Sequence, residues 1–442
     1  MSGLPKGWKE LSIGEVTLPF KSIDPTKEPS KEYRYIDIGS IDNSRQIITD
    51  PKAFKGRDAP SRARRVVQEC DVLFSTVRTY LKNIATVPRE LSGALTSTGI
   101  AVLRSSALMD SSYLFHWVTS DAFVTEISKA QDGTMYPAVS DRDVLSSRIA
   151  VPPLTEQRRI VAKLDSLTGG TTRAREQLGR IPRLISKYRE AILSKAFEGV
   201  FVGLSSAGQV TLSAYVKSLD QGWSPKCESS ASDDPKDWAV IKTTAIQPIH
   251  FFACENKKLP PTLQPRPNIQ IQAGDVLITR AGPRSRVGIS CVVTTARPHL
   301  MLCDKAYRIR AKDGKADPTF LAMMLNSPQA LRQIEEMKTG ISDSGLNLTQ
   351  EKFLNLSLPK LNLEQQQTTV RRIETAFAWL DRVAAEHANA SRLLPKLDQA
   401  ILAKAFRGEL ISQNSTEGGN LVPPPKLEGN PHRQSGANRQ RT

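Results

Sequence analysis

The sequence has few cysteines and no long apolar run, and both absences limit what the chain can be. The 442 residues include five cysteines, none of which forms a Cys-x-x-Cys pair. An odd number of unpaired cysteines supports neither a disulfide framework nor a zinc knuckle, so we expect reduced thiols and a cytoplasmic protein. No window approaches the ~18 apolar residues of a membrane helix, and the N-terminal MSGLPKGWKE lacks a hydrophobic signal segment. The sequence predicts neither a membrane span nor secretion.

Motifs of known catalytic centres are missing as well. The chain contains neither the G-x-x-x-x-G-K-[ST] phosphate loop nor a G-x-G-x-x-G turn after a strand. It also lacks the N-P-P-F and D-P-P-Y signatures of adenine methyltransferases, and its five histidines show no H-x-x-x-H spacing. The triplets at 255–257 and 313–315 match the end of a D…[DE]-x-K nuclease motif, but such triplets arise by chance among 61 basic and 45 acidic residues. We therefore expect no catalytic residue, metal or cofactor in this chain.

The chain is strongly basic, with a formal net charge of +16 and a pI of about 9.6. A surplus of this size suggests a polyanionic partner. The alternative is a generally basic protein without such a partner.

The chain repeats its own parts in the same order. AILSKAFEG (191–199) returns 209 residues later as AILAKAFRG (400–408), with seven of nine residues identical. Further parallels pair VPPLTEQ (151–157) with LPKLNLEQ (358–365), CDVLFSTVR (70–78) with GDVLITRAG (274–282), and residues 111–127 with 318–334. The sequence is therefore a tandem duplication of a unit of about 200 residues, which is too long for a solenoid repeat.

Each half has a front that is typical of a mixed α/β domain. Short β-branched runs such as GIAVLR and GISCVV alternate with turn residues. One amphipathic helix is expected in each front, at 111–127 and at 318–334.

The back of each half is expected to be one long helix with a heptad seam. In the first half the seam residues are Ile160, Leu164, Leu167, Thr171, Ala174, Leu178, Ile181, Ile185, Tyr188 and Ile192. In the second half they are Ile373, Ala376, Leu380, Val383, His387, Ala390, Leu394, Leu397 and Ile401. Spacings of three and four residues favour two helices that pack on each other. Gly169–Gly170 should weaken the first helix, and Pro182 and Pro395 should kink or break their helices.

The predicted fold class is α+β, with two mixed α/β domains joined by two long antiparallel helices and an internal pseudo-two-fold duplication. The expected parts are a first head (1–150), a first helical region (151–200), a second head (201–358), a second helical region (359–410) and a disordered tail (411–442). A molecule with such symmetry can engage the two halves of a bipartite DNA site, with the helices setting the distance between them.

Candidate DNA contacts lie where a strand runs into a basic loop. Three stretches have this character: SRARR (61–65), STVRTYLKN (75–83) and TRAGPRSRVG (279–288). The candidate residues are Arg62, Arg64, Arg65, Arg78, Thr79, Tyr80, Lys82, Thr279, Arg280, Arg284 and Arg286. Arginine and lysine read guanine edges or hold phosphate, and threonine and tyrosine can contact phosphate. QDGTMYP (131–137) and TGISDSG (339–345) occupy matching positions and are expected on the same face.

The whole pattern resembles the DNA specificity subunits of type I restriction–modification systems. The resemblance is carried by LPKGW (4–8), PPLTEQRRIVAKLDSL (152–167), GDVLITR (274–280), EQQQTTVRRIETAFAWLDRV (364–383) and the two nonapeptides. It extends over nearly the whole chain up to about residue 411. The second PPL-x-EQ motif departs from the pattern, since it reads PKLNLEQ with one residue inserted.

The resemblance implies a non-catalytic subunit whose heads each read one half of a split sequence in double-stranded DNA. Two methyltransferase subunits would dock on the helices, carry S-adenosylmethionine and methylate adenine after flipping it out. Two restriction subunits could add ATP- and Mg²⁺-dependent translocation and cleavage. Candidates for the coiled coil and for partner docking are Ile160, Leu164, Ile185, Ile192, Ile373, Leu380, Leu394 and Ile401.

Three alternatives stay open at this point. The first is a specificity subunit of a related phage-defence methylation system without a nuclease. The second is a stand-alone nuclease or methyltransferase, and the third is a scaffold that is indifferent to DNA.

Overall fold

The chain forms two compact units that each contain residues from distant parts of the sequence. The computed structural model describes residues 4–129 and 138–412. The units are Met1–Arg173 with Leu394–Thr442, and Ala174–Leu393. The predicted tail beyond residue 412 and the segment QDGTMYP (131–137) lie outside the described residues. Within the described ranges, no helix is both long and apolar enough to cross a membrane.

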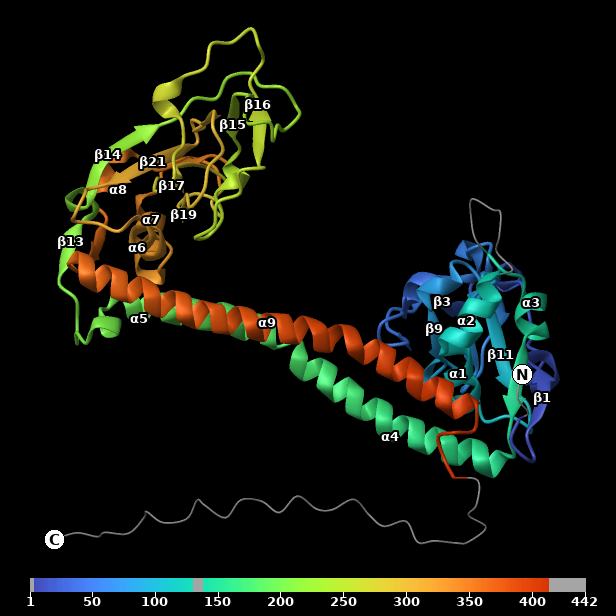
Figure 1. The fold of residues 1–442 in the computed structure, drawn as a ribbon. Helices are drawn as coiled ribbons and strands as arrows, with labels where there is room; N and C mark the ends of the chain where they lie inside the picture. Colours follow the sequence, from blue (N-terminus) through green and yellow to red (C-terminus); the bar gives the residue numbers. More distant parts are fainter. Residues whose placement is uncertain (1–3, 130–137, 413–442) are drawn as a thin grey trace, which may run out of the picture. The chain divides into compact units, whose positions relative to one another are not determined.

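The head of the first unit consists of small sheets covered by short helices (Figure 1). Its strands are β1 (Lys9–Ser12), β2 (Thr17–Leu18), β3 (Glu32–Ile36), β4 (Ile41–Asp42), β5 (Ile47–Ile48), β6 (Lys52–Lys55), β7 (Ala63–Val66), β8 (Val72–Ser75), β9 (Ile84–Thr86), β10 (Leu95–Ser97), β11 (Ile100–Ser105) and β12 (Arg148–Val151). Its helices are α1 (Ser111–Thr119), α2 (Asp121–Ser128) and α3 (Asp141–Ser146). The main sheets have the orders β2-β11-β8-β9 and β6-β3-β10-β7, and β1 pairs with β12.

The head of the second unit is built in the same way. Its strands are β13 (Gln209–Thr211), β14 (Val216–Gln221), β15 (Ala239–Ile241), β16 (Asn256–Lys258), β17 (Val276–Thr279), β18 (Ala281–Gly282), β19 (Ser290–Val292), β20 (Leu300–Met301), β21 (Ala306–Ala311), β22 (Leu346–Asn347) and β23 (Ser357–Pro359). Its helices are α6 (Pro318–Leu325), α7 (Pro328–Met337) and α8 (Gln350–Leu354). The sheet orders are β14-β21-β17-β19 and β16-β15-β20, and β13 pairs with β23.

The two heads share one strand order. The sheet β2-β11-β8-β9 corresponds to β14-β21-β17-β19, and the pair β1-β12 corresponds to β13-β23. In both heads the second sheet contains a parallel pair, β3 with β10 and β15 with β20. An ion pair is repeated as well, between Asp71 and Arg104 and between Asp275 and Arg310. The duplication that the sequence predicts therefore extends to the topology of the heads.

The expected single helix of each front is in fact two helices. Ser120 has extended backbone angles and caps α2 by accepting a hydrogen bond from the Phe123 amide. Ser327 caps α7 in the same way, and Pro328 follows it in the first turn. Serine at the N-cap and proline in the first turn both start a new helix, so these positions end the predicted continuous one.

The long helices are α4 (Leu154–Leu178), α5 (Ile181–Phe197) and α9 (Leu363–Phe406). The predicted break at Pro182 is confirmed, because this proline lies in the first turn of α5, where its missing N–H is not needed. Of the predicted kink or break at Pro395, the break is wrong, since α9 continues through this residue. Loss of one helical hydrogen bond is tolerated there because Leu402 and Phe406 anchor the following turns in the core.

The heptad seam is largely confirmed. Two members of the list, Tyr188 and Leu397, are wrong because their side chains are 58% and 49% exposed. A straight α-helix drifts by about 20° per heptad against a strict seven-residue repeat, so a seam position can rotate out of the contact.

The seam residues that face the core differ in depth. Ile160, Leu164, Ile373 and Leu380 are buried, whereas Ile185, Ile192, Leu394 and Ile401 are partly buried. The helices run antiparallel in the first unit, where Ile160 and Leu164 of α4 join Leu402 of α9 in one cluster and Thr171, further along α4, binds Asp398.

The repeated nonapeptides each seat a helix end in a head. Ala196 and Phe197 of the first copy lie in the core of the second unit. Ala405 and Phe406 of the second copy lie in the core of the first unit, where the Phe406 ring meets that of Tyr113 edge-on at 5.2 Å. Each nonapeptide therefore closes the head of the other half of the sequence.

Two buried glutamines join the heads to the long helices. The Gln157 side-chain amide donates to the carbonyls of Pro152 and Leu108, and its oxygen accepts from the Asp110 amide. These three distances lie between 2.8 and 2.9 Å. Both ends of the carboxamide are thus satisfied within the protein.

Gln366 makes the same three contacts in the second unit, to Leu361, Lys315 and Asp317. Both glutamines are completely buried. Gln157 ends the PPLTEQ segment, and Gln366 directly follows LNLEQ (361–365). The buried glutamine therefore recurs at the same offset of 209 residues as the nonapeptides.

Replacing either glutamine with leucine should destabilise its unit. The substitution leaves one amide N–H and two carbonyls buried without partners, and we expect a loss of about 1–3 kcal/mol for the free energy of unfolding. Urea denaturation of Gln157→Leu and Gln366→Leu measures this loss. Gln367→Leu is the matched control, because Gln367 is exposed. Equal effects of Gln366→Leu and Gln367→Leu would contradict the role of the buried Gln366 carboxamide in joining the head to the long helix.

Candidate nucleic-acid interface

A strained loop at the end of β8 presents part of the candidate surface in the first head. Arg78 and Lys82 both adopt the left-handed backbone conformation, with φ of 50° and 52°, which costs a non-glycine residue about 1–2 kcal/mol. The Lys82 ammonium binds the Thr119 carbonyl at 2.9 Å and the Asp121 carboxylate at 2.6 Å. Asn43 donates to the Leu81 carbonyl from the other side. These contacts hold the loop in its conformation.

The four predicted DNA contacts of this loop differ in their exposure to solvent. Thr79 is 1% exposed and shares a hydrogen bond with Ser128, so with Lys82 it supports the loop from inside. The Tyr80 side chain is 58% exposed, and Arg78 is exposed beside it. Of the four candidates, only Arg78 and Tyr80 are placed to meet a ligand.

The SRARR stretch offers one arginine rather than three. Arg64 is paired with Asp24 and also donates to the Ser61 carbonyl. Arg65 binds Asp141 at 2.6 Å and lies over the ring of Phe20. Arg62 is exposed, and no hydrogen bond or ion pair joins its guanidinium to any described residue. Arg64 and Arg65 therefore help to hold the head together, and their contact with DNA stays a prediction.

The basic loop of the second head is also internally bonded. Thr279 is completely buried and donates to the Arg286 carbonyl. The Arg280 guanidinium donates to the Asp304 carbonyl at 2.6 Å and lies over the Tyr307 ring. Gly282 has φ of 140°, a conformation that favours glycine, as expected for a tight turn before Pro283.

Arg284 and Arg286 bind other segments of the second head. Arg284 pairs with Asp343 and Glu335, and these hydrogen bonds raise the pKa of its guanidinium. Arg286 donates to the carbonyls of Thr243 and Ile246 and to Gln247. The arginines of the cluster 279–286 are thus bonded within the head, and their contact with DNA stays a prediction. The sequence could not reveal these bonds, because the partners lie tens of residues away along the chain.

The segment TGISDSG (339–345) lies against this cluster, since Asp343 binds Arg284. Ile341 at its tip is fully exposed. The segment is therefore accessible from solvent, and its contact with nucleic acid stays a prediction.

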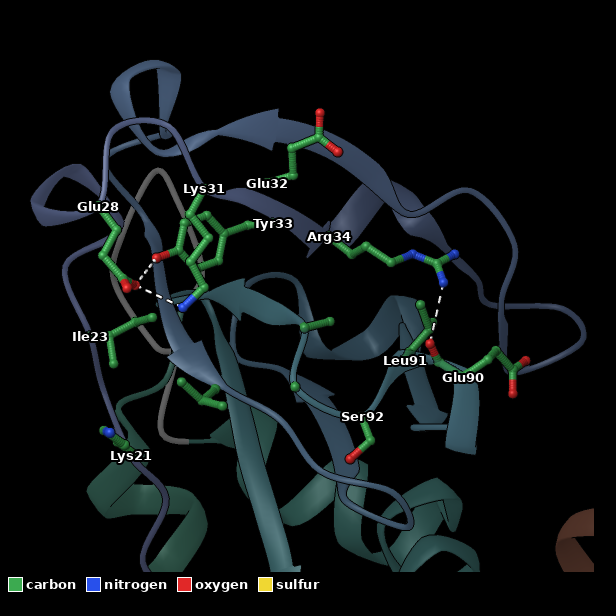
Figure 2. Close-up of a pocket in the computed structure, with 13 residues that line it drawn as sticks. Lys21, Ile23, Glu28, Lys31, Glu32, Tyr33, Arg34, Glu90, Leu91 and Ser92 are labelled. Carbon is green, nitrogen blue, oxygen red and sulfur yellow. Dashed lines mark hydrogen bonds and ion pairs between the residues drawn. The ribbon is translucent and has the colours of Figure 1, made fainter.

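A hollow of the first head is lined by charged residues, some of which are paired with one another (Figure 2). It has a volume of about 540 Å³. Glu28 accepts hydrogen bonds from Lys31 and from the Tyr33 hydroxyl, which lower the pKa of Glu28. Arg34 donates to the Glu90 carbonyl.

A metal-binding cluster is not found in the part of the chain that the structure describes. No group of three or more His, Cys, Asp or Glu side chains is placed there to hold an ion. In the triplet 255–257, Glu255 pairs with Lys242 at 3.7 Å, and Asn256 is buried against Ser232. That no metal or cofactor binds this chain stays a prediction.

Two solved structures are similar to this chain over nearly its whole length. The HsdS subunit from Thermoanaerobacter tengcongensis is 31% identical, with a TM-score of 0.62, over 92% of this chain and 98% of that one. A chain from a structure described as showing complex assembly and conformational transition of the type I R-M system is also 31% identical. Its TM-score is 0.70, and the match covers 93% of this chain and all of that one.

Curated relatives agree with the structural comparison. The specificity subunit of the type I restriction enzyme EcoKI from Escherichia coli K12 is 26% identical over 95% of this chain and 92% of its own length. The EcoEI specificity subunit from Escherichia coli is 32% identical, but the match spans only 43% of this chain and 32% of that relative. No protein-family model matches the chain.

Replacing Arg286 with alanine should lower the stability of the second head. The substitution removes the donors for the Thr243 and Ile246 carbonyls, and we expect a loss of about 1–3 kcal/mol in the free energy of unfolding. Urea denaturation compares this variant with Arg332→Ala, which removes an exposed arginine from the same head. If Arg286→Ala left stability unchanged and only weakened ligand binding, the assignment of Arg286 as a scaffold residue would be wrong.

Proposed function

The chain belongs to the specificity subunits of type I restriction–modification systems, and we propose on this basis that each head recognises one half of a bipartite DNA target. The observation that carries the proposal is the repetition of one head. Both heads share a strand order, and each is bonded to a long helix through a buried glutamine. Their exposed loops differ, because Arg78 and Tyr80 of the first head correspond to Gly282 and Arg284 of the aligned segment in the second. One frame with two different surfaces suits recognition of two different half-sites.

The charge of the chain supports DNA as the ligand. A net charge of +16 favours association with a phosphate backbone, which supplies much of the affinity of DNA-binding proteins. In the first head, Arg62, Arg78 and Tyr80 are exposed. Arginine can hold phosphate or guanine, and the tyrosine ring can stack on a base or contact phosphate.

The partners are proposed to be catalytic, and this chain is not. Two methyltransferase subunits would bind S-adenosylmethionine and modify adenine, and two restriction subunits would supply ATP- and Mg²⁺-dependent cleavage. The contribution of this chain would be the choice of site and, through the long helices, the spacing between the half-sites.

The long helices carry apolar side chains that suit a docking partner. In the second unit, Leu184 and Tyr188 of α5 are 48% and 58% exposed, and Trp379 of α9 is 55% exposed. Exposed apolar patches often mark protein interaction sites, and tryptophan and tyrosine often dominate interface energies. We propose that a methyltransferase subunit covers this surface.

Replacing Trp379 with alanine should weaken assembly with the methyltransferase subunit by about 2 kcal/mol, a typical loss for a central interface residue. Size-exclusion chromatography and titration calorimetry of the purified subunits measure the change. Leu108→Ala serves as the control, since Leu108 is an equally exposed apolar residue on the first head. Unchanged affinity in Trp379→Ala would place the docking surface elsewhere.

Exchanging residues 201–358 for the second head of another specificity subunit should change one half of the recognised sequence. The first head is untouched in this chimera, so its half-site should persist. Selection of bound duplexes from a random pool, with the assembled complex, reads out both halves. Simultaneous change of both half-sites would contradict the assignment of one half-site to each head.

A further inference from the structure

Each head contains a hollow at the carboxyl end of its parallel strand pair. In the first head a hollow of about 420 Å³ lies beside β3 and β6 and includes Lys52 and Arg62. In the second head a hollow of about 320 Å³ lies beside β15 and β16 and includes Lys242, Lys257 and Lys305. The carboxyl ends of parallel strands are a common location for ligand sites.

The two hollows occupy equivalent places in the duplicated fold. The Thr76 amide donates to the Gly99 carbonyl, and the Arg280 amide donates to the Lys305 carbonyl, so Gly99 and Lys305 correspond. Four residues earlier, Leu95 pairs with Tyr35 and Met301 pairs with Val240. Tyr35 and Val240 are therefore at the same position, although the sequence around them shows no likeness.

The register of the next strand then aligns two lysines. Lys52 of β6 pairs with Tyr35, and Lys257 of β16 pairs with Val240. A short 3₁₀ turn also follows β3 and β15 at the same distance from Tyr35 and Val240. It starts at Ile38 in the first head and at Thr243 in the second. The duplicated fold thus places a lysine at one position of each hollow.

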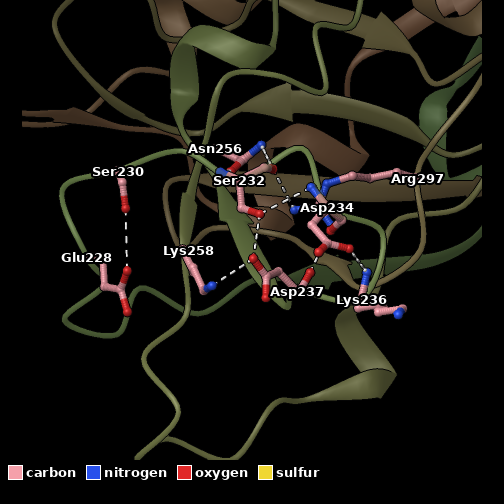
Figure 3. Close-up of polar contacts among 9 residues, drawn as sticks. All are labelled: Glu228, Ser230, Ser232, Asp234, Lys236, Asp237, Asn256, Lys258 and Arg297. Carbon is pink, nitrogen blue, oxygen red and sulfur yellow. Dashed lines mark hydrogen bonds and ion pairs between the residues drawn. The ribbon is translucent and has the colours of Figure 1, made fainter.

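The lysine of the second hollow is separated from the polar network behind it. Lys257 and Lys258 are neighbours on β16, so their side chains point to opposite faces. Lys258 binds Asp237 at 2.8 Å, within a cluster that also ties Ser232, Asn256 and Arg297 together (Figure 3). Lys257 is exposed, and no hydrogen bond or ion pair joins its ammonium to any described residue. The polar network therefore binds Lys258, whereas Lys257 is available to bind a ligand in the hollow.

The remaining positions of the hollows differ in chemistry. Tyr35 and Phe54 form an edge-to-face aromatic pair in the first, where the second has Val240. Asp37, two residues after Tyr35, binds Lys52 in the first head. The corresponding residue of the second head is Lys242, which pairs with Glu255 and lines the hollow together with Asp304 and Lys305. A shared lysine with different neighbours fits a shared backbone contact beside different bases.

We propose that these two hollows are the DNA-contacting sites of the heads, with Lys52 and Lys257 each binding a backbone phosphate of its own half-site. This inference rests on the proposed function and goes beyond it by assigning the contact to residues that the sequence did not single out. Lys52 is itself paired with Asp37, but its side chain is 61% exposed, and an ammonium has three donors, so it can bind a phosphate as well. The arginines of the basic loop 279–286 are bonded within the head, and this loop is assigned to supporting the site.

The test measures binding of the complex of this chain with its methyltransferase subunits to fluorescent duplexes at several salt concentrations. Lys52→Ala and Lys257→Ala should each weaken binding to the full target about fivefold near 0.15 M salt and lower the salt slope by about one, since one phosphate contact is lost. On duplexes with a single intact half-site, each variant should weaken binding to one half-site and leave the other unchanged.

Lys9→Ala and Lys236→Ala are matched controls, because both remove an exposed lysine from a head outside its hollow. Losses in Lys52→Ala and Lys257→Ala no larger than in these controls, or losses without a change in salt slope, would overturn the inference while leaving the proposed function intact. A wild-type complex that bound target and scrambled duplexes equally would overturn the proposed function and the inference together.

Discussion

The buried carboxamides of Gln157 and Gln366 are the interactions on which the arrangement of the chain depends. Each satisfies two carbonyls and one amide in a site without solvent, and each joins the first turn of a long helix to the segment before a helix of the head. A buried amide with all its partners present fixes geometry more strictly than apolar packing does, because any displacement leaves a polar group unpaired. The nonapeptides then seat the opposite ends of the helices in the other core through Phe197 and Phe406.

The long helices and the glutamine contacts form a frame that is repeated in both halves, whereas the surfaces of the two heads differ. The strand order, the glutamine contacts and the pairs Asp71–Arg104 and Asp275–Arg310 occur in both heads. The loops and hollows around them carry different side chains. A recognition protein with two half-sites needs this division, since the frame must place both heads alike while each surface reads its own sequence.

The sequence was sufficient for the frame but not for the surface. The duplication, the long helices and the break at Pro182 could be predicted, because each depends on local residue identity or on regular spacing. The roles of Arg64, Arg284 and Arg286 could not, since their partners Asp24, Asp343 and the Thr243 carbonyl are remote in sequence. Lys52 and Lys257 were missed for a similar reason. Only strand register shows that they are equivalent, and no nearby motif marks them.

The central proposal is that this chain decides where a methyltransferase acts. The most direct test is methylation sequencing of DNA from cells that express the neighbouring methyltransferase gene with this chain and without it. The proposal predicts a split adenine motif that is methylated only when this chain is present. Methylation of the same motif without the chain would contradict the proposal and reduce the paired nonapeptides to the mark of a structural duplication.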